Sequence, residues 1–386
     1  MNRFNLLTSK RYRFISAIVV CWLSFASVVF SSVVFSSLAQ IASANAATDV
    51  AKGVTTSITG LNVFGDSLVD AGNIFNLTGF PPSPPYAQQL SNGPVWPEQL
   101  ADKLGINPVL STEALPTLNN GATSLPAQGI NFALAGSLTS QLNSASASLP
   151  GLQQQVADFV ALTRLMPPDP NALYVLLAGG NDYNSAVTNS TAAATLAALP
   201  NQVTDNLINA TSALIDAGAR HLLVSNLPDL SGQPLADFLN LANPQSAERL
   251  SQLSLQHNLL LGQKLDRLEA ASNAEIIQLD LAKLFVDTIT NPASFGFTNV
   301  TTACLSNAQA KPELQHICNN PDEFLFWDDR HPTVAGHRAI AQLAFSNLVQ
   351  QDPKLSRTKV TVPLGALGLI GGVGIGAIAL FKRYSS

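Results

Sequence analysis

Ser67 is the first residue whose type and setting could carry out chemistry. It lies in the segment 64–68 (Phe-Gly-Asp-Ser-Leu), directly after an apolar run, where a tight turn is expected to hand over to a helix. Backbone N–H groups and the positive end of a helix at such a turn favour an oxyanion formed on the acyl partner of a serine. Ser67 is therefore a candidate nucleophile, and the alternative is a serine that only caps the helix.

A candidate base occurs near the other end of the chain, in the segment 327–333 (Trp-Asp-Asp-Arg-His-Pro-Thr). Asp328 precedes His331 by three residues, so its carboxylate can reach the imidazole Nδ1–H and leave Nε2 free to take a proton from a serine. Asp329 competes with Asp328 for this orienting role. The alternative is that Asp328 or Thr333 caps the following helix and that His331 is a surface histidine.

Two further segments contain candidate hydrogen-bond donors for an oxyanion. Residues 129–136 end at Gly136, whose backbone N–H is not obstructed by a side chain, and Asn181 follows a Gly-Gly pair. Acyl transfer needs donors aimed at the developing negative oxygen, and the asparagine amide is a neutral donor. A loop glycine and a turn asparagine are the alternatives.

Strands and helices alternate in the part of the chain that must position these residues. This alternation predicts an α/β fold, a three-layer α/β/α sandwich with a mainly parallel central sheet. Ligands of such sheets bind beyond the carboxyl ends of the strands, so each candidate residue should fall just after a strand. Residues 79–93 and 105–128 are predicted to be irregular because they are rich in Pro, Ser, Thr and Asn. The predicted strands are 59–64, 173–178, 221–225 and 274–279, and the predicted helices are 98–104, 149–166, 202–217, 246–271 and 334–350.

The four chemical segments, in this order, resemble the signature blocks of the GDSL or SGNH hydrolase family. The resemblance implies that Ser67 is the nucleophile and that Asp328 and His331 complete a catalytic triad. It also implies an oxyanion hole made by the Ser67 N–H, Gly136 and Asn181.

The resemblance extends over nearly all of residues 59–350. Segments 91–96 (Ser-Asn-Gly-Pro-Val-Trp) and 325–328 (Leu-Phe-Trp-Asp) are similar to the lipase-like branch, which includes plant GDSL lipases and bacterial phospholipase or haemolysin-type acylhydrolases. One departure is Ala-Gly-Ser at 135–137, where Gly-Gly-Ala or Ala-Gly-Ala is common.

The predicted function is hydrolysis of a small-molecule or lipid ester through an acyl-enzyme, without a cofactor or metal. A carbohydrate O-acetylesterase is one alternative, because the resembling family includes deacetylases. A catalytically silent surface-binding protein that keeps the fold is another. The sequence does not specify the acyl chain, the alcohol or the oligomeric state.

Both ends of the chain are apolar, which predicts export. Residues 1–46 resemble a signal peptide, with four basic residues before a long apolar run and Ala-Asn-Ala at the cleavage position. The alternative is a retained N-terminal anchor, since the apolar run is longer than usual. Residues 47–360 then form the hydrolase domain.

Residues 361–386 are predicted to be a membrane or sorting tail. Within it, residues 364–381 are uncharged and long enough to cross a bilayer, and two basic residues follow. The tail resembles bacterial PEP-CTERM sorting tails, although Val-Pro-Leu at 362–364 replaces their Pro-Glu-Pro. A buried C-terminal helix is the alternative. The expected location is thus periplasmic, cell-surface or secreted, with membrane contact through this tail.

Charge and cysteine usage agree with an exported esterase. The net charge of -5 includes six basic residues at the two ends, so the part between them is near -11, which argues against nucleic acid as a partner. Cys21 lies in the predicted leader, which leaves Cys304 and Cys318. Two nearby cysteines in an exported protein, without clustered histidines, favour a disulfide over a metal site.

Overall fold

A six-stranded parallel sheet organises the computed structural model, which describes residues 58–308 and 314–351. The strand order is β2-β3-β1-β4-β5-β6, and every neighbouring pair is parallel. The long central strands are almost entirely buried, as apolar runs covered on both faces must be. The strands are β1 (Leu61–Gly65), β2 (Val109–Leu110), β3 (Ile130–Asn131), β4 (Leu173–Leu177), β5 (His221–Ser225) and β6 (Glu275–Leu279).

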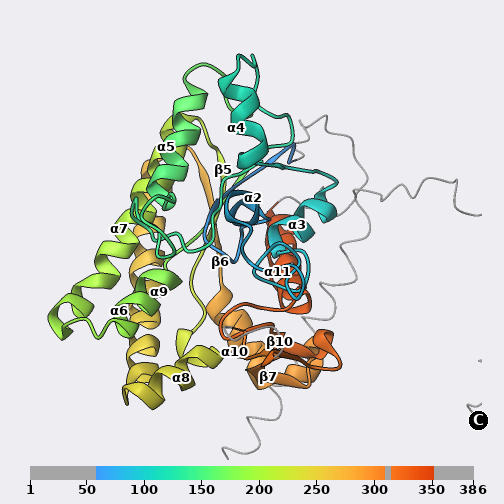
Figure 1. Ribbon diagram of the computed structural model, residues 1–386. Coiled ribbons are helices and arrows are strands. Elements are labelled where there is room, and N and C mark those ends of the chain that lie inside the picture. Colours follow the sequence, from blue (N-terminus) through green and yellow to red (C-terminus); the bar gives the residue numbers. More distant parts are fainter. Residues whose placement is uncertain (1–57, 309–313, 352–386) are drawn as a thin grey trace, which may run out of the picture. The chain divides into compact units, whose positions relative to one another are not determined.

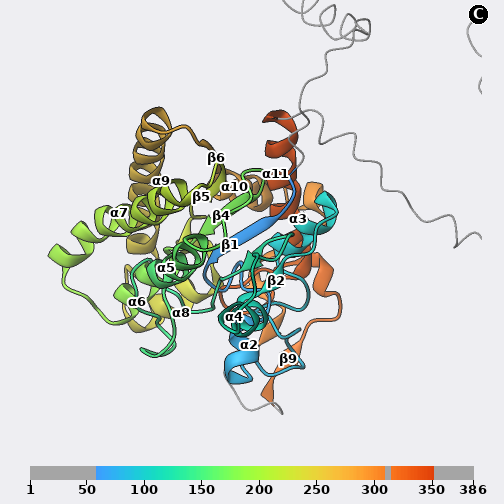
Figure 2. The same cartoon turned by 90° about the horizontal axis from the view of Figure 1, so that it is seen from above.

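Helices cover both faces of this sheet, so the predicted α/β/α sandwich is confirmed (Figures 1 and 2). Alternate residues of β4 show why: Val175 belongs to one apolar core, and Tyr174 and Leu176 belong to the other. One layer contains α5 (Leu152–Thr163), α7 (Ala193–Ala217) and α9 (Ser246–Ala271), and the other contains α3 (Trp96–Leu104), α10 (Leu281–Thr290) and α11 (Val334–Gln351).

Shorter elements connect these layers. The strands β7 and β10 form a parallel pair, and β8 and β9 form an antiparallel pair. These elements are α2 (Asn73–Thr78), α4 (Ser111–Asn119), α6 (Gly180–Thr188), η1 (Leu230–Gly232), α8 (Pro234–Ala242), η2 (Pro292–Phe295), β7 (Asn299–Ala303), β8 (Leu305–Ser306), β9 (His316–Ile317), η4 (Pro321–Glu323) and β10 (Phe324–Phe326).

Two expectations about the elements are wrong. The stretch 105–128 is not wholly irregular, because it contains β2 and α4. Helix α7 begins at Ala193, earlier than the predicted 202, although Pro200 lies inside it. Proline disfavours a helix interior, but Leu196 and Val203 on either side of it both pack into one buried cluster, which stabilises the helix across this position.

The predicted leader (1–46) and tail (361–386) lie outside the described residues, so the expectations about them stay predictions. Within the described ranges, no helix is both long and apolar enough to cross a membrane.

Candidate active site

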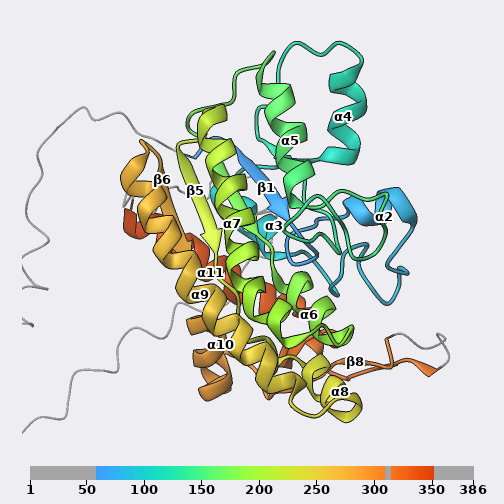
Figure 3. The same cartoon turned by 90° about the vertical axis from the view of Figure 1, so that its left-hand side faces the viewer.

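The turn that contains Ser67 follows β1 at the carboxyl edge of the sheet. In Figure 3 the arrowheads of β1 and β5 point toward the end of the domain that carries α6 and α8. Gly65 ends β1 at φ +148°, where a Cβ atom would lie 1.9 Å from the carbonyl oxygen of Leu177 on β4, so only glycine fits. The N–H groups of Val69 and Asp70 donate to the Asp66 carbonyl oxygen and close the turn.

The expectation that a helix starts directly after this turn is wrong. Helix α2 begins at Asn73, and its first N–H groups donate to the carboxylate of Asp70, which caps it. Ser67 is therefore not the cap of this helix, and its side chain is left for another role.

Three predicted residues meet in one hydrogen-bonded chain. The imidazole Nε2 of His331 lies 2.9 Å from Ser67 Oγ, and its Nδ1 lies 2.8 Å from both carboxylate oxygens of Asp328. Because a carboxylate only accepts, Nδ1 carries the proton, and Nε2 accepts from the serine hydroxyl. All three residues are buried. The arrangement suits removal of the Ser67 proton by His331.

Asp328 is held as an anion by several donors. It accepts hydrogen bonds from the backbone N–H groups of Arg330 and His331 and from the hydroxyl of Tyr86 at 2.8 Å. Burial alone would raise the pKa of Asp328, but the positive charge and hydrogen bond of His331, with the backbone donors, lower that pKa to about 2. Asp329 instead pairs with Arg330 at 3.0 Å. The structure thus places Asp328, and not Asp329, against the histidine.

Asp66 shows the opposite electrostatic state beside the same serine. Its side chain accepts one backbone hydrogen bond, from Leu68 at 3.0 Å. Burial raises the pKa of Asp66 to about 7, and this outweighs the lowering by that hydrogen bond and by His331. The site therefore contains one strongly acidic carboxyl, Asp328, and one, Asp66, that loses its proton only near neutral pH.

The candidate oxyanion donors lie after β3 and β4. Gly136 has φ +81°, and a Cβ there would lie 2.5 Å from Asn143 Oδ1, so the position favours glycine. Among residues 58–308 and 314–351, the backbone N–H groups of Ser67 and Gly136 have no acceptor. Asn181, in the first turn of α6, donates one amide hydrogen to the Ser137 carbonyl at 3.1 Å and keeps its second one.

A second contact joins the same two segments. The carboxylate of Asp182 accepts from the backbone N–H of Thr139 at 3.0 Å and from its hydroxyl at 2.9 Å. Burial raises the pKa of Asp182 to about 6, although the hydrogen bonds from Thr139 oppose this rise. The segment after Gly136 and the start of α6 are thereby fixed to each other.

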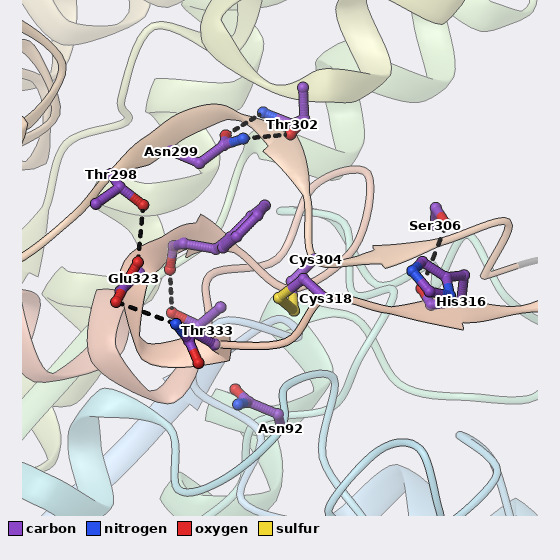
Figure 4. Close-up of a disulfide and its surroundings, with 12 residues drawn as sticks. Asn92, Thr298, Asn299, Thr302, Cys304, Ser306, His316, Cys318, Glu323 and Thr333 are labelled. Carbon is purple, nitrogen blue, oxygen red and sulfur yellow. Dashed lines mark hydrogen bonds between the residues drawn. A yellow bond between two sulfur atoms is a disulfide. The ribbon is translucent and has the colours of Figure 1, made fainter.

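The two remaining predicted site residues form a disulfide next to this region (Figure 4). Cys304 and Cys318 are bonded, and they flank the β8–β9 pair. The N–H of Cys304 donates to the Phe326 carbonyl, and that of Leu305 donates to the Trp327 carbonyl. The disulfide therefore supports the segment that leads into Asp328. No group of His, Cys, Asp and Glu side chains in the described part of the chain is arranged to hold a metal ion.

The comparisons with known proteins agree with this geometry. Residues 61–344 match the model of the GDSL-like lipase/acylhydrolase family. The chain belongs to this family. The expected class, carboxylic ester hydrolase, is thereby confirmed at the level of the family.

Three relatives show how far this GDSL-like chain resembles known proteins. It is 32% identical to an uncharacterised Pseudomonas putida protein from the trpE–trpG intergenic region, over 80% of this chain and 51% of the relative. It is 26% identical to the phosphatidylcholine-sterol acyltransferase of Aeromonas hydrophila, over 75% and 90%. It is 30% identical to the esterase EstA of Pseudomonas aeruginosa, over 75% and 46%. The chain thus spans about half the length of two of these relatives.

Sequence reasoning missed two residues of this GDSL-like site. Tyr86, which donates to Asp328, lies in a stretch expected to be irregular, where no periodic pattern marks it. Gln155 contacts Gly65 and Ser137 from α5. A signal for Gln155 does exist, since it is a polar residue on the apolar face that Leu152 and Phe159 define.

Proposed function

We propose that this protein is a serine esterase that hydrolyses carboxylic esters of small molecules or lipids through an acyl-enzyme on Ser67. The observation that carries the proposal is the hydrogen-bonded chain from Ser67 Oγ through His331 to Asp328. It is supported by family membership and by the two backbone N–H groups available beside the serine.

The mechanism follows from these contacts. Ser67 Oγ bonds to the ester carbonyl carbon while His331 Nε2 takes the hydroxyl proton. Asp328 stabilises the imidazolium that results. The N–H groups of Ser67 and Gly136 and the free amide hydrogen of Asn181 donate to the resulting oxyanion. The imidazolium then protonates the leaving alcohol, and water, deprotonated by His331, releases the acid and restores Ser67.

Covalent labelling tests the nucleophile. An organophosphonate should modify the wild-type chain at Ser67, as located by peptide mass mapping, and should not modify Ser67→Ala. Ser294→Ala, a change at an exposed serine outside the site, is the matched control and should label normally. Label on another residue, or undiminished turnover by Ser67→Ala, contradicts the proposal.

A chain-length series separates the possible substrates. Lipid esters are proposed because a relative that aligns over most of both chains is named as an acyltransferase acting with phosphatidylcholine. Turnover of p-nitrophenyl acetate, butyrate and palmitate by the purified domain should therefore extend to the longer chains. Activity restricted to acetate would favour a carbohydrate O-acetylesterase, and inactivity toward all three would favour a silent binding protein.

We further propose that the enzyme is exported and held at a membrane through residues 364–381. The support lies in the sequence alone, in the leader at 1–46 and in the uncharged run followed by basic residues.

A further inference from the structure

The side-chain amide of Gln155 lies between the nucleophile turn and the segment that contains Gly136. Gln155 Oε1 accepts from the backbone N–H of Gly65 at 2.8 Å, and its Nε2 donates to the carbonyl oxygen of the same residue at 2.9 Å. Nε2 also donates to Ser137 Oγ at 2.8 Å. The side chain is 1% exposed, so these bonds are made without competition from water.

Only a glutamine-like amide satisfies this set of partners. The backbone N–H of Gly65 needs an acceptor, and its carbonyl oxygen needs a donor. The Gln155 amide offers both, with its oxygen toward the N–H and its nitrogen toward the carbonyl, so these two bonds fix the orientation of the amide. Ser137 in turn donates its hydroxyl hydrogen to the Leu134 and Pro150 carbonyls and accepts from Gln155. An apolar side chain at 155 would leave the buried N–H of Gly65 unpaired.

The helix that carries Gln155 is itself fixed to the loop after Gly136. The start of α5 donates two backbone hydrogen bonds to this loop: the N–H of Gly151, the N-cap, donates to the Gln141 carbonyl at 2.9 Å, and that of Leu152 donates to the Leu138 carbonyl at 3.0 Å. Gln155 is one turn further along α5. The backbone of α5 and the segment after Gly136 are therefore hydrogen-bonded to each other. The Gln155 amide reaches β1 from a helix that is fixed relative to Gly136.

We infer that Gln155 is a positioning residue that sets the distance between the Ser67 turn and the oxyanion donors. The inference rests on the proposed function. Gly65 lies two residues before Ser67, and Ser137 follows Gly136 and accepts from the Asn181 amide at 3.1 Å. One side chain thus connects the nucleophile with both of the other donor segments. Since a displacement of about 1 Å at a reacting centre can cost on the order of 10²-fold in rate, this connection controls turnover.

Gln155→Met tests the inference, because methionine has a similar length and makes none of the three hydrogen bonds. With p-nitrophenyl butyrate, kcat should fall about 10²-fold and KM should stay within about threefold, since the donors act on the transition state. Gln154→Met is the matched control on the same helix. Its side chain is exposed and bonds only Asp158 at 2.7 Å, so its kinetics should equal those of the wild type.

A second variant covers the case in which Gln155→Met does not fold. Gln155→Glu keeps the size and the acceptor for Gly65 N–H, but its carboxyl can keep at most one of the two donated bonds, and only when it is protonated. It should therefore show the same selective loss of kcat. A folded variant of either kind with wild-type kcat, or failure of both to fold, overturns the inference.

A double variant separates positioning from a purely structural role. If Gln155 acts through the donors, Asn181→Ala should cost much less in the Gln155→Met background than in the wild type, whereas independent effects would multiply and contradict the inference. Labelling of Ser67 in the wild type tests the proposed function separately. Ser67 labelled, with Gln155 variants fully active, would leave the proposed function standing and remove only this inference.

Discussion

Two buried aspartates near Ser67 illustrate how position decides the state of a carboxyl group. Asp328 accepts from Tyr86, from two backbone N–H groups and from His331, so it is stable as an anion. Asp66 is equally buried but accepts only one backbone bond, and burial raises its pKa to about 7. The sequence places both residues in the two chemical blocks, but the number of donors facing each carboxyl follows only from the folded chain.

Asp66 should make stability fall with rising pH. Its usual pKa is 3.8 and its folded pKa is about 7. Between these values the unfolded chain has lost the proton and the folded chain keeps it, so stability decreases across this window, by up to about 4 kcal/mol at about 1.4 kcal/mol for each pKa unit. Asp66→Asn removes this titration.

Denaturant unfolding at about pH 5 and about pH 8 checks the prediction for Asp66. The variant should gain stability over the wild type at the higher pH and show a smaller difference at the lower pH. Asp216→Asn, a change at an exposed carboxylate on α7, is the control and should follow the wild type at both. If the free energy of unfolding changes equally between the two pH values in Asp66→Asn and in the wild type, the prediction of a protonated Asp66 is contradicted.

Tyr86→Phe should lower kcat because Tyr86 acts on Asp328 and not on the substrate. The lost hydroxyl leaves the buried carboxylate with one donor fewer, and a hydrogen bond to a charged group contributes about 1.5–3 kcal/mol. The carboxylate that orients His331 is then held less firmly, so steady-state kinetics should show a lower kcat while the unfolding temperature stays close to the wild-type value. A wild-type kcat with a lower unfolding temperature would assign Tyr86 to packing, against Trp327, alone.

Asn181→Ala should reduce kcat about 10²–10³-fold, the usual effect of removing one oxyanion donor. KM should change little, because the ground-state carbonyl is not yet an oxyanion. Steady-state kinetics and thermal unfolding of the same preparation check this. A rise in KM as large as the fall in kcat would show that Asn181 acts in substrate binding. A large drop in the unfolding temperature would show that it stabilises the fold through its bond to Ser137.

At the scale of elements, the predictable strands are those buried on both faces. The apolar runs that became β1, β4, β5 and β6 were predicted because burial on two faces requires such runs. Strands β2 and β3 have two residues each at one side of the sheet, which is too short for any periodicity to appear. Helices α8 and α10 were also not predicted.

The same distinction applies to the site. Ser67, Gly136, Asn181 and the Asp328–His331 pair were predicted together because four contiguous blocks resemble the signature of one family. Tyr86 meets Asp328 across 242 positions, and Gln155 meets Gly65 across 90. No spacing rule connects residues so far apart, so these contacts could not be predicted from the sequence.

Removal of the Cys304–Cys318 disulfide should destabilise the folded domain. The disulfide closes a loop with a separation of 14 residues, for which chain entropy predicts about 3 kcal/mol. Cys304→Ser combined with Cys318→Ser should therefore lower the unfolding temperature by about 5 °C. Thiol titration of the denatured, unreduced full chain should detect Cys21 alone. Three thiols would contradict the pairing.

At the scale of the whole molecule, the family match ends at residue 344, within α11, and that helix packs on α3 in the same layer. The domain core from Leu61 to Leu348 is closed by this contact. The residues of the candidate site, from Ser67 to His331, all precede this helix. We therefore expect the tail to be separable from catalysis.

Removal of residues 362–386 should release an active enzyme from the membrane. In the full chain the uncharged run 364–381 is expected to hold the protein in the membrane fraction, because no side chain in it is charged. A milder variant, Val373→Arg, places a charge at the middle of this run, where insertion costs about 2.5–3.5 kcal/mol, and should release much of the protein with its length unchanged. Fractionation and p-nitrophenyl butyrate turnover measure both effects. Truncated enzyme that is soluble and has the wild-type kcat supports the proposed tether, whereas a truncated chain that unfolds or loses activity would make the tail part of the enzyme core.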